Sequence, residues 1–303
     1  MGRKKKETGE TYEQRQARLE QSFDLATKEI HRREVTFDTN NYVVMANNMV
    51  LHTASNLTLN EVKLLRFFIM QTEKDDKELY QYTASVSNLA ASLEISKEAL
   101  YRELDKMTEH LMREVIRIPG KKKDEWLKFH WVDVCKYENG LLTVKIADTL
   151  KPFLTDLRRD FTRYHLSDIV GVNSIYAIRI YEMLSRYIDE NNQPHADVAI
   201  EISVSIEELR RITSTQDKLE RYSSFKAKVI DTAIKEINQK SKYHVTATPY
   251  KRGRSVAGFD FKIESQIGFT HRQKSIAPKA KKDKDGQMNL SDFQAGDNTF
   301  IIS

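Results

Sequence analysis

The feature that most constrains the fold is an order of sequence patterns that occurs twice along the chain. Each half carries an apolar helix, a strand, a short helix, a long amphipathic helix and a β-hairpin. The short helices lie in VSNLAASLEI near residue 86 and VSIEELRRI near residue 204. The long helices follow Ser96 and Ser223, and the hairpins lie in VIRIPGKKKDEWLKFHW and HVTATPYKRGRSVAGFDF. This order is that of a helix-turn-helix followed by a wing. The sequence therefore predicts an α+β fold made of two tandem winged-helix domains.

Positive charge is concentrated in the second long helix and its hairpin. The whole chain has 49 Lys and Arg against 44 Asp and Glu, a net charge of +5. Residues 221–254 alone hold nine basic and two acidic residues, so this stretch carries more net charge than the entire chain. Its apolar residues fall on one face at the helical period. A docked helix with a mostly basic outer face, followed by a basic hairpin, indicates a DNA-binding surface.

The candidate DNA-contacting residues form three groups. The N-terminal part of a recognition helix reaches base edges, and here it offers Arg221, Ser223, Ser224, Lys226, Lys228 and Asp231, with Lys235 further along facing phosphate or solvent. The second wing offers Lys251, Arg252 and Arg254 beside Gly253, which permits positive φ. The first wing offers Lys121, Lys122 and Lys123. The first long helix interleaves glutamates with its basic residues, so we expect it to read DNA less well and to serve in dimerisation instead.

The sequence offers no pattern typical of catalysis or of metal binding. Its eight histidines lie far apart and Cys135 is its one cysteine, so we expect neither a metal site nor an internal disulfide. Gly253 and Gly258 are spaced as in a P-loop, but Phe259 and Asp260 stand where Lys and Ser or Thr are needed. We therefore expect no enzymatic activity and no cofactor.

The chain also has no pattern typical of membrane insertion. No apolar run reaches the ~18 residues that a membrane-spanning helix needs, and the N-terminus lacks an apolar signal core. We expect a cytoplasmic protein without a membrane partner. Cys135 lies in the alternating segment WVDVCKY, which predicts a buried structural thiol in a strand.

Several segments resemble a known family. FKAKVIDTAIKEINQ, followed by Pro249 and KRGR, is similar to the second winged-helix domain of iteron-binding plasmid replication initiators. LTLNEVKLLRFFI, VSNLAASLEIS and IYAIRIYEMLSRY resemble other parts of the same family. The resemblance covers about residues 37–264. It implies two winged-helix domains that bind directly repeated origin sequences, with the major-groove helix at residues 223–240 and wing contacts at Lys251, Arg252 and Arg254.

The resemblance also implies a set of partners. The first is double-stranded origin DNA, and the second is another copy of the chain, in a homodimer that forms through the first domain and interconverts with the monomer. Such dimers repress the initiator's own promoter. Initiation in this family proceeds by opening an adjacent A·T-rich stretch and recruiting the host initiator and the replicative helicase.

The tail suggests one more partner. Gln287, Leu290 and Phe293 loosely resemble a sliding-clamp-binding peptide, which presents a glutamine, a leucine and an aromatic residue in a flexible segment. The spacing departs from the usual bacterial form, in which the aromatic residue follows the leucine directly.

These patterns divide the chain into four parts. A charged connection at residues 151–160, which contains Pro152, is placed at the domain boundary. The predicted parts are a charged N-terminal arm (1–36), a first winged-helix domain for dimerisation and auxiliary DNA contact (37–155), a second winged-helix domain that reads DNA (156–264) and a flexible Lys-rich tail (265–303).

Three functions compete for this organisation. The first is a plasmid replication initiator, and the second is a winged-helix transcriptional regulator without origin function. The third, a catalytic replication protein that nicks or primes DNA, is disfavoured by the missing metal and nucleotide motifs. Two different winged helices without a ligand-binding domain favour the initiator over the regulator.

Overall fold

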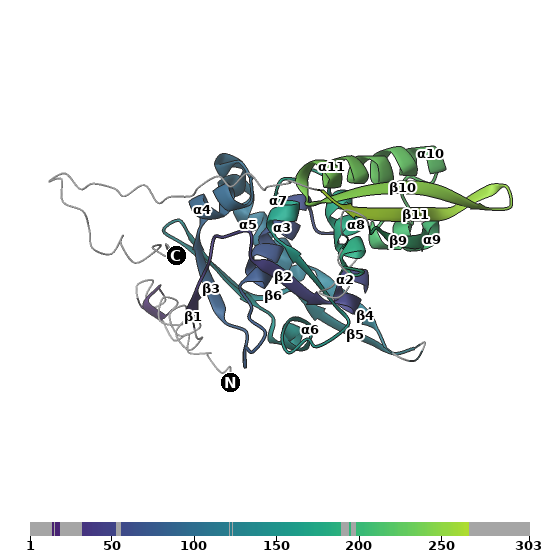
Figure 1. The fold of residues 1–303 in the computed structure, drawn as a ribbon. Coiled ribbons are helices and arrows are strands. Elements are labelled where there is room, and N and C mark those ends of the chain that lie inside the picture. Colours follow the sequence, from purple (N-terminus) through teal and green to yellow (C-terminus); the bar gives the residue numbers. More distant parts are fainter. Residues whose placement is uncertain are drawn as a thin grey trace, which may run out of the picture.

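The chain folds into two winged-helix units that pack against one another (Figure 1). The computed structural model describes residues 14, 16–18, 32–52, 56–120, 122, 124–188, 194 and 198–266. The mixture of helices and small sheets, in which every strand pair but β1–β3 is antiparallel among the described residues, confirms the predicted α+β class.

The first unit is built on a four-stranded sheet. Its strands lie in the order β1 (Arg32–Glu34), β3 (Gln81–Ser85), β7 (Leu141–Ile146) and β6 (Val132–Glu138). The helices that complete it are α2 (Asn47–His52), α3 (Leu59–Met70), α4 (Val86–Ser92) and α5 (Lys97–Arg113). Helix α3 is buried on nearly every side, as its almost wholly apolar sequence predicts.

The second unit repeats this plan. Its sheet has the order β10 (Tyr243–Arg252), β11 (Ser255–Ser265) and β9 (Ile200–Ser205). Its helices are α8 (Ile175–Ser185), α9 (Ile206–Ile212), α10 (Tyr222–Phe225), the π-helical segment η2 (Lys226–Asp231) and α11 (Thr232–Lys240). In sheet position, β9 corresponds to β3, and the hairpin β10–β11 corresponds to β6–β7.

This correspondence corrects the predicted first wing. The sequence matched the hairpin β4 (Val115–Pro119) and β5 (Trp126–His130) to β10–β11, but these two strands form a separate two-stranded sheet. The hairpin that pairs with β3 is β6–β7, which closes at Asn139 and Gly140. The prediction was wrong because both hairpins alternate and both follow the long helix, so only the strand pairing distinguishes an inserted hairpin from a wing.

A second two-stranded sheet lies where the two units meet. Strand β2 (Tyr42–Ala46) pairs with β8 (Phe161–His165), and β8 lies beyond the predicted boundary at residues 155 and 156. The short elements η1 (Asp148–Leu150), α6 (Lys151–Leu154) and α7 (Ser167–Val170) complete this connection. The charged segment at residues 151–160 is therefore followed by a strand that belongs with β2.

A buried ion pair joins α3 to α8. Arg66 Nε lies 2.6 Å from Glu182 Oε1, and both side chains are almost fully buried. The Tyr164 hydroxyl donates to the same Glu182 oxygen at 2.5 Å. Burial acts to lower the pKa of Arg66, but Glu182 and Tyr164 together outweigh burial and raise that pKa. Because a buried charge without its partner is costly, this pair fixes how the two apolar helices pack.

A second group of contacts crosses the same boundary. Lys63 Nζ donates to the Val170 carbonyl, and burial lowers the pKa of Lys63 to about 8. Arg211 Nη1 donates to the Leu51 carbonyl at 2.7 Å. These contacts and the Arg66–Glu182 pair hold the second unit in one orientation against the first.

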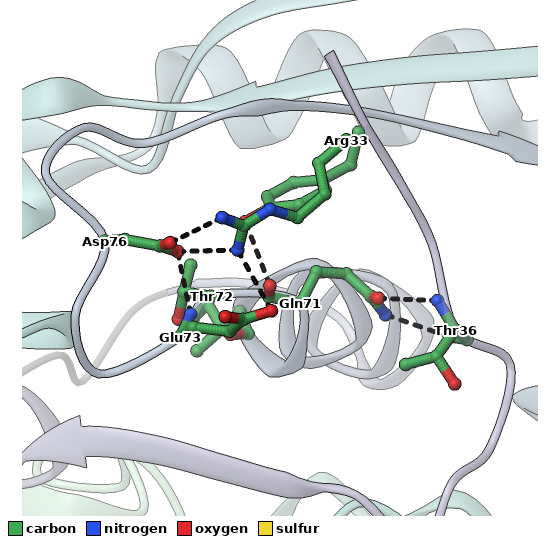
Figure 2. A network of polar contacts seen from close by, with 8 residues as sticks. Arg33, Thr36, Gln71, Thr72, Glu73 and Asp76 are labelled. Carbon is green, nitrogen blue, oxygen red and sulfur yellow. Dashed lines mark hydrogen bonds and ion pairs between the residues drawn. The ribbon is translucent and has the colours of Figure 1, made fainter. Parts of the chain in front are cut away.

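The folded part of the chain begins earlier than the sequence predicts. Figure 2 shows Arg33 pointing at Asp76 and Glu73, with Nη2 2.7 Å from Asp76 Oδ1 and Nη1 3.3 Å from Glu73 Oε1. Thr36 and Gln71 exchange two hydrogen bonds, of 2.9 and 3.1 Å. Residues 32–36 were assigned to the charged arm because they lack apolar alternation, but these polar contacts place β1 on the edge of β3.

Side-chain hydroxyls cap several helix starts of both units. Thr58 and Glu61 form the complete capping box that their spacing predicts. Ser96 caps α5 and Ser205 caps α9 through their hydroxyls. Ser205 and Glu208 also have the spacing of a capping box, but only half of it forms, because the Glu208 carboxylate pairs with Arg211 at 2.6 Å rather than reaching back to Ser205.

Candidate nucleic-acid interface

The recognition helix of the second unit runs through α10, η2 and α11. Its apolar side chains are buried against the sheet and α8; they are Phe225, Val229, Ile230, Ala233 and Ile237. The middle of the helix is a π-helical segment, η2. Such segments insert one residue into a turn and are frequent at functional sites.

An outer row of exposed residues runs along this helix. We use this name for Ser223, Ala227, Lys228, Asp231 and Lys235, all of which are exposed. Ser224 and Lys226 are half-buried. The reading residues proposed from the sequence therefore separate into an exposed set and a partly covered set, with Ser223 rather than Ser224 at the open end of the row.

Lys226 and Asp231 form an ion pair along the helix. Lys226 Nζ lies 2.6 and 2.8 Å from the two carboxylate oxygens of Asp231. Residues five apart do not face one another in an α-helix, where neighbours are three or four apart. The wider turn of η2 brings these two side chains together, so the pair is a consequence of the π geometry.

The wing is a long basic hairpin beside the start of this helix. In Figure 1 the hairpin β10–β11 extends past α10 at the same end of the unit. Lys251, Arg252 and Arg254 are exposed at its tip. The turn itself is tight, because the strands continue to Arg252 and Ser255 and leave two residues between them.

Two glycines shape this wing. Gly253 has φ +64° with nothing within 4 Å of a Cβ built on it, as a two-residue turn that begins with glycine requires. A Cβ on Gly258 would meet the Val204 carbonyl oxygen at 2.2 Å and the Tyr250 hydroxyl at 2.5 Å. Gly258 is therefore needed for the close approach of β9, and the pairing shifts register at Tyr250 and Lys251 to turn the tip.

Sequence reasoning missed the residues that hold the recognition helix in place. Arg210 donates four hydrogen bonds of 3.0 Å to carbonyls in the turn before the helix, and its guanidinium lies 4.5 Å from the Phe225 ring centroid. The Asn238 side chain exchanges two hydrogen bonds with the backbone of Val245 at the start of the wing. Nothing in the sequence pattern distinguishes these polar residues from solvated ones.

A carboxylate also ties this helix to α8. Glu236 accepts the backbone N–H groups of Asn173 and Ser174, each at 2.9 Å. Ser174 caps α8 in turn. The recognition helix is therefore fixed at three places: at Arg210 before it begins, at Glu236 along it and at Asn238 near its end.

The first unit presents a different surface. Lys122 is exposed and lies 3.5 Å from Glu125, while Lys121 and Lys123 lie outside the described residues. On α5, Arg102 pairs with Glu103 at 2.9 Å and Arg113 pairs with Glu109 at 3.4 Å. The hairpin β4–β5 exposes large apolar side chains, namely Val115, Trp126 and Leu127.

Other predicted features are placed as follows. Cys135 is free and half-buried in β6, where burial raises the pKa of its thiol to about 12. Among the described residues, no group of three or more His, Cys, Asp or Glu could hold a metal ion. The same part of the chain contains no helix long and apolar enough to cross a membrane. Gln287, Leu290 and Phe293 lie outside the described residues.

Comparison with known proteins decides the family. One family model, "Initiator Replication protein, WH1", matches residues 42–185, and a second, "Initiator Rep protein, WH2", matches residues 205–263. The chain belongs to the replication initiator (Rep) family. The two models match the two winged-helix units in order, with the first model extending through α8, and the resemblance inferred from the sequence is confirmed.

Individual members of this family are distant from the chain. A "Replication initiation protein" of Escherichia coli is 22% identical over 226 residues, which are 73% of this chain and 69% of that protein. A solved structure, "Crystal structure of Pi initiator protein in complex with iteron DNA", is 19% identical and has a TM-score of 0.63. The match covers 76% of this chain and 99% of that one, and it shows that the two share a fold.

Proposed function

We propose that this protein is a plasmid replication initiator that binds direct repeats at its origin through the second winged-helix unit. The observation that carries this proposal is the outer row of the recognition helix beside a basic wing tip, at one end of the unit. Ser223, Ala227 and Lys228 have the side chains that read base edges in the major groove. Lys251, Arg252 and Arg254, together with Arg221 and Lys235, are assigned to phosphate.

The Pi initiator supports this assignment by analogy. That protein has the same fold, and its crystal structure is of a complex with iteron DNA. A protein that meets roughly 6–10 phosphates loses about 10³–10⁵ in affinity between 50 and 200 mM salt. We expect the present chain to show a dependence of this size on DNA that carries its repeats.

The later steps of initiation are part of the same proposal. DNA binding leads to opening of an adjacent A·T-rich stretch and to recruitment of the host initiator and the replicative helicase. No chemistry on DNA is assigned to the chain and no cofactor is needed, because its residues only bind and orient DNA. The protein acts in the cytoplasm.

The first unit is proposed to mediate self-association. The hairpin β4–β5 exposes Val115, Trp126 and Leu127, each at least half exposed, and these apolar side chains are the candidate contacts for a second copy of the chain. The homodimer represses the initiator's own promoter, and the monomer binds origin repeats. We further propose that the boundary between the units lies between the end of β8 and the start of α8, because β8 pairs with β2 and Glu236 ties the start of α8 to the recognition helix.

Replication of an origin plasmid tests the function. The DNA beside the coding gene is cloned on a plasmid that cannot otherwise replicate, and the protein is supplied in trans. We expect replication, and we expect it to be lost when Lys251, Arg252 and Arg254 are changed together to glutamine. Repression of the adjacent promoter without plasmid replication would instead support a winged-helix transcriptional regulator.

A further inference from the structure

One carboxylate lies in the middle of the DNA-reading surface. Asp231 is exposed in the outer row, between Lys228 and Lys235. The recognition helix has only one other acidic residue, Glu236, and that side chain is turned toward the Asn173 and Ser174 amides. Asp231 is therefore the carboxylate that meets any DNA docked on this helix.

A carboxylate at this place opposes DNA binding unless it finds a donor. Phosphate repels it, and every non-specific complex includes phosphate contacts. In the major groove, cytosine presents its N4 amino group, from which an Asp or Glu side chain can accept a hydrogen bond. DNA docked on the helix displaces the water around Asp231, and a carboxylate that loses its water needs further hydrogen-bond donors, so the free energy of docking depends on the base that Asp231 faces.

The ion pair with Lys226 gives Asp231 a fixed position. Both carboxylate oxygens lie within hydrogen-bonding distance of Lys226 Nζ, at 2.6 and 2.8 Å, and the π turn of η2 sets their spacing. Because the two side chains are already paired in the free protein, neither needs to lose further conformational entropy when DNA binds. Lys226 is at the same time withheld from phosphate by its partner.

We propose that the Lys226–Asp231 pair is a specificity element, in which Asp231 accepts a hydrogen bond from a cytosine N4 group at one position of the recognised repeat. This inference rests on the proposed DNA-binding function. Where cytosine is absent, Asp231 weakens docking and Lys226 adds no phosphate contact. The pair therefore lowers affinity for wrong DNA more than it raises affinity for the correct repeat.

Selection from random DNA tests the pair even when the sequence of the repeat is unknown. The full chain selects from a pool of double-stranded oligonucleotides with a randomised core, and enriched sequences are compared for wild type and Asp231→Asn. We expect wild type to enrich a motif with cytosine at one position, and the variant to lose preference at that position alone. The ratio of specific to non-specific affinity should fall by about tenfold. The salt slope on non-specific DNA should steepen by about one unit, because Lys226 is released to phosphate.

A matched control removes a carboxylate elsewhere in the same unit. Glu201 is exposed on β9, away from the recognition helix, so Glu201→Gln should leave both the motif and the salt slope unchanged. If Asp231→Asn enriches the wild-type motif with equal stringency, the specificity role is refuted while the DNA-binding function stands. If wild type enriches no motif, both the specificity role and sequence-specific origin binding are refuted.

Discussion

The two winged-helix units share a topology and differ in the surface that each presents. Both have a three-strand arrangement in which the last hairpin packs beside the first strand, as β6–β7 does with β3 and β10–β11 with β9. Their long helices differ in charge. Helix α5 holds acidic and basic residues in equal number apart from His110, whereas residues 221–240 hold five basic and two acidic residues.

The wings differ as clearly as the helices. The first-unit wing closes at Asn139 and Gly140, both with positive φ, and the Gly140 carbonyl accepts the Val86 N–H at 2.9 Å. That tip is tied back to the start of α4. The second-unit wing ends at Gly253, with open space around it, and it carries its basic residues beyond the body of the unit.

The comparison teaches that a repeated topology does not repeat a function. The same element order supports an assembly surface in one unit and a reading surface in the other, because function depends on side chains at the tips and outer faces. The two surfaces remain coupled, since Arg66, Lys63 and Arg211 make contacts that hold the two units together.

The largest effect is expected where the units are joined. Arg66→Met leaves the Glu182 carboxylate buried without its partner, so we expect it to lower the free energy of unfolding by about 3–5 kcal/mol. Arg113→Met, which removes an exposed pair with Glu109 on α5, should cost about 0–1 kcal/mol. Urea denaturation measures both, and equal losses would show that the Arg66–Glu182 pair does not stabilise the join.

A pH dependence probes the same boundary from Lys63. Its pKa is about 8 in the folded chain and 10.5 as its ordinary value, so the unfolded chain binds more protons between these values. Stability should therefore rise as pH rises through this window, by an upper limit of about 3 kcal/mol. The methionine of the Lys63→Met variant does not titrate. Between pH 8 and 10, the measured free energy of unfolding should therefore rise more for the wild type than for the variant. An equal change of the free energy of unfolding with pH in both proteins would mean that Lys63 is not buried between the two units.

A smaller effect, on DNA sequence preference, should distinguish the roles of the two long helices. Ser223→Ala together with Lys228→Ala should relax sequence preference by about 1–3 kcal/mol per lost base contact, while overall folding is kept. The matched change on α5 is Glu98→Ala with Arg102→Ala, which should leave preference unchanged. Binding to the selected repeat and to scrambled DNA distinguishes these outcomes, and a loss of preference from the α5 change would mean that both helices read bases.

Sequence periodicity was sufficient for the main elements of the fold. The two-domain plan, the Thr58 capping box and the basic recognition helix all follow from local spacing, because caps and amphipathic faces are local properties. The identity of the first wing was not predictable in this way. Hairpins β4–β5 and β6–β7 have similar patterns, and the choice between them depends on pairing with β3, which lies far away along the chain.

The positive charge of the DNA-binding surface was predictable from the sequence, but its individual side-chain contacts were not. The clustering of Lys251, Arg252 and Arg254 is visible in the sequence, but the Lys226–Asp231 pair is not, because a five-residue spacing pairs side chains only in a π turn. Arg210 and Asn238 were missed for a related reason: their partners are backbone groups brought close by folding.

The most direct test of the division between the units compares two matched triple variants. One changes Lys251, Arg252 and Arg254 to glutamine, and the other changes Lys121, Lys122 and Lys123 to glutamine. DNA affinity is measured for each between 50 and 200 mM salt. The second-unit triple should flatten the slope of log affinity against log salt by about 2–3 units, and the first-unit triple should change it by less than about one unit. Equal flattening by the two triples, or greater flattening by the first-unit triple, would contradict the assignment of DNA reading to the second unit.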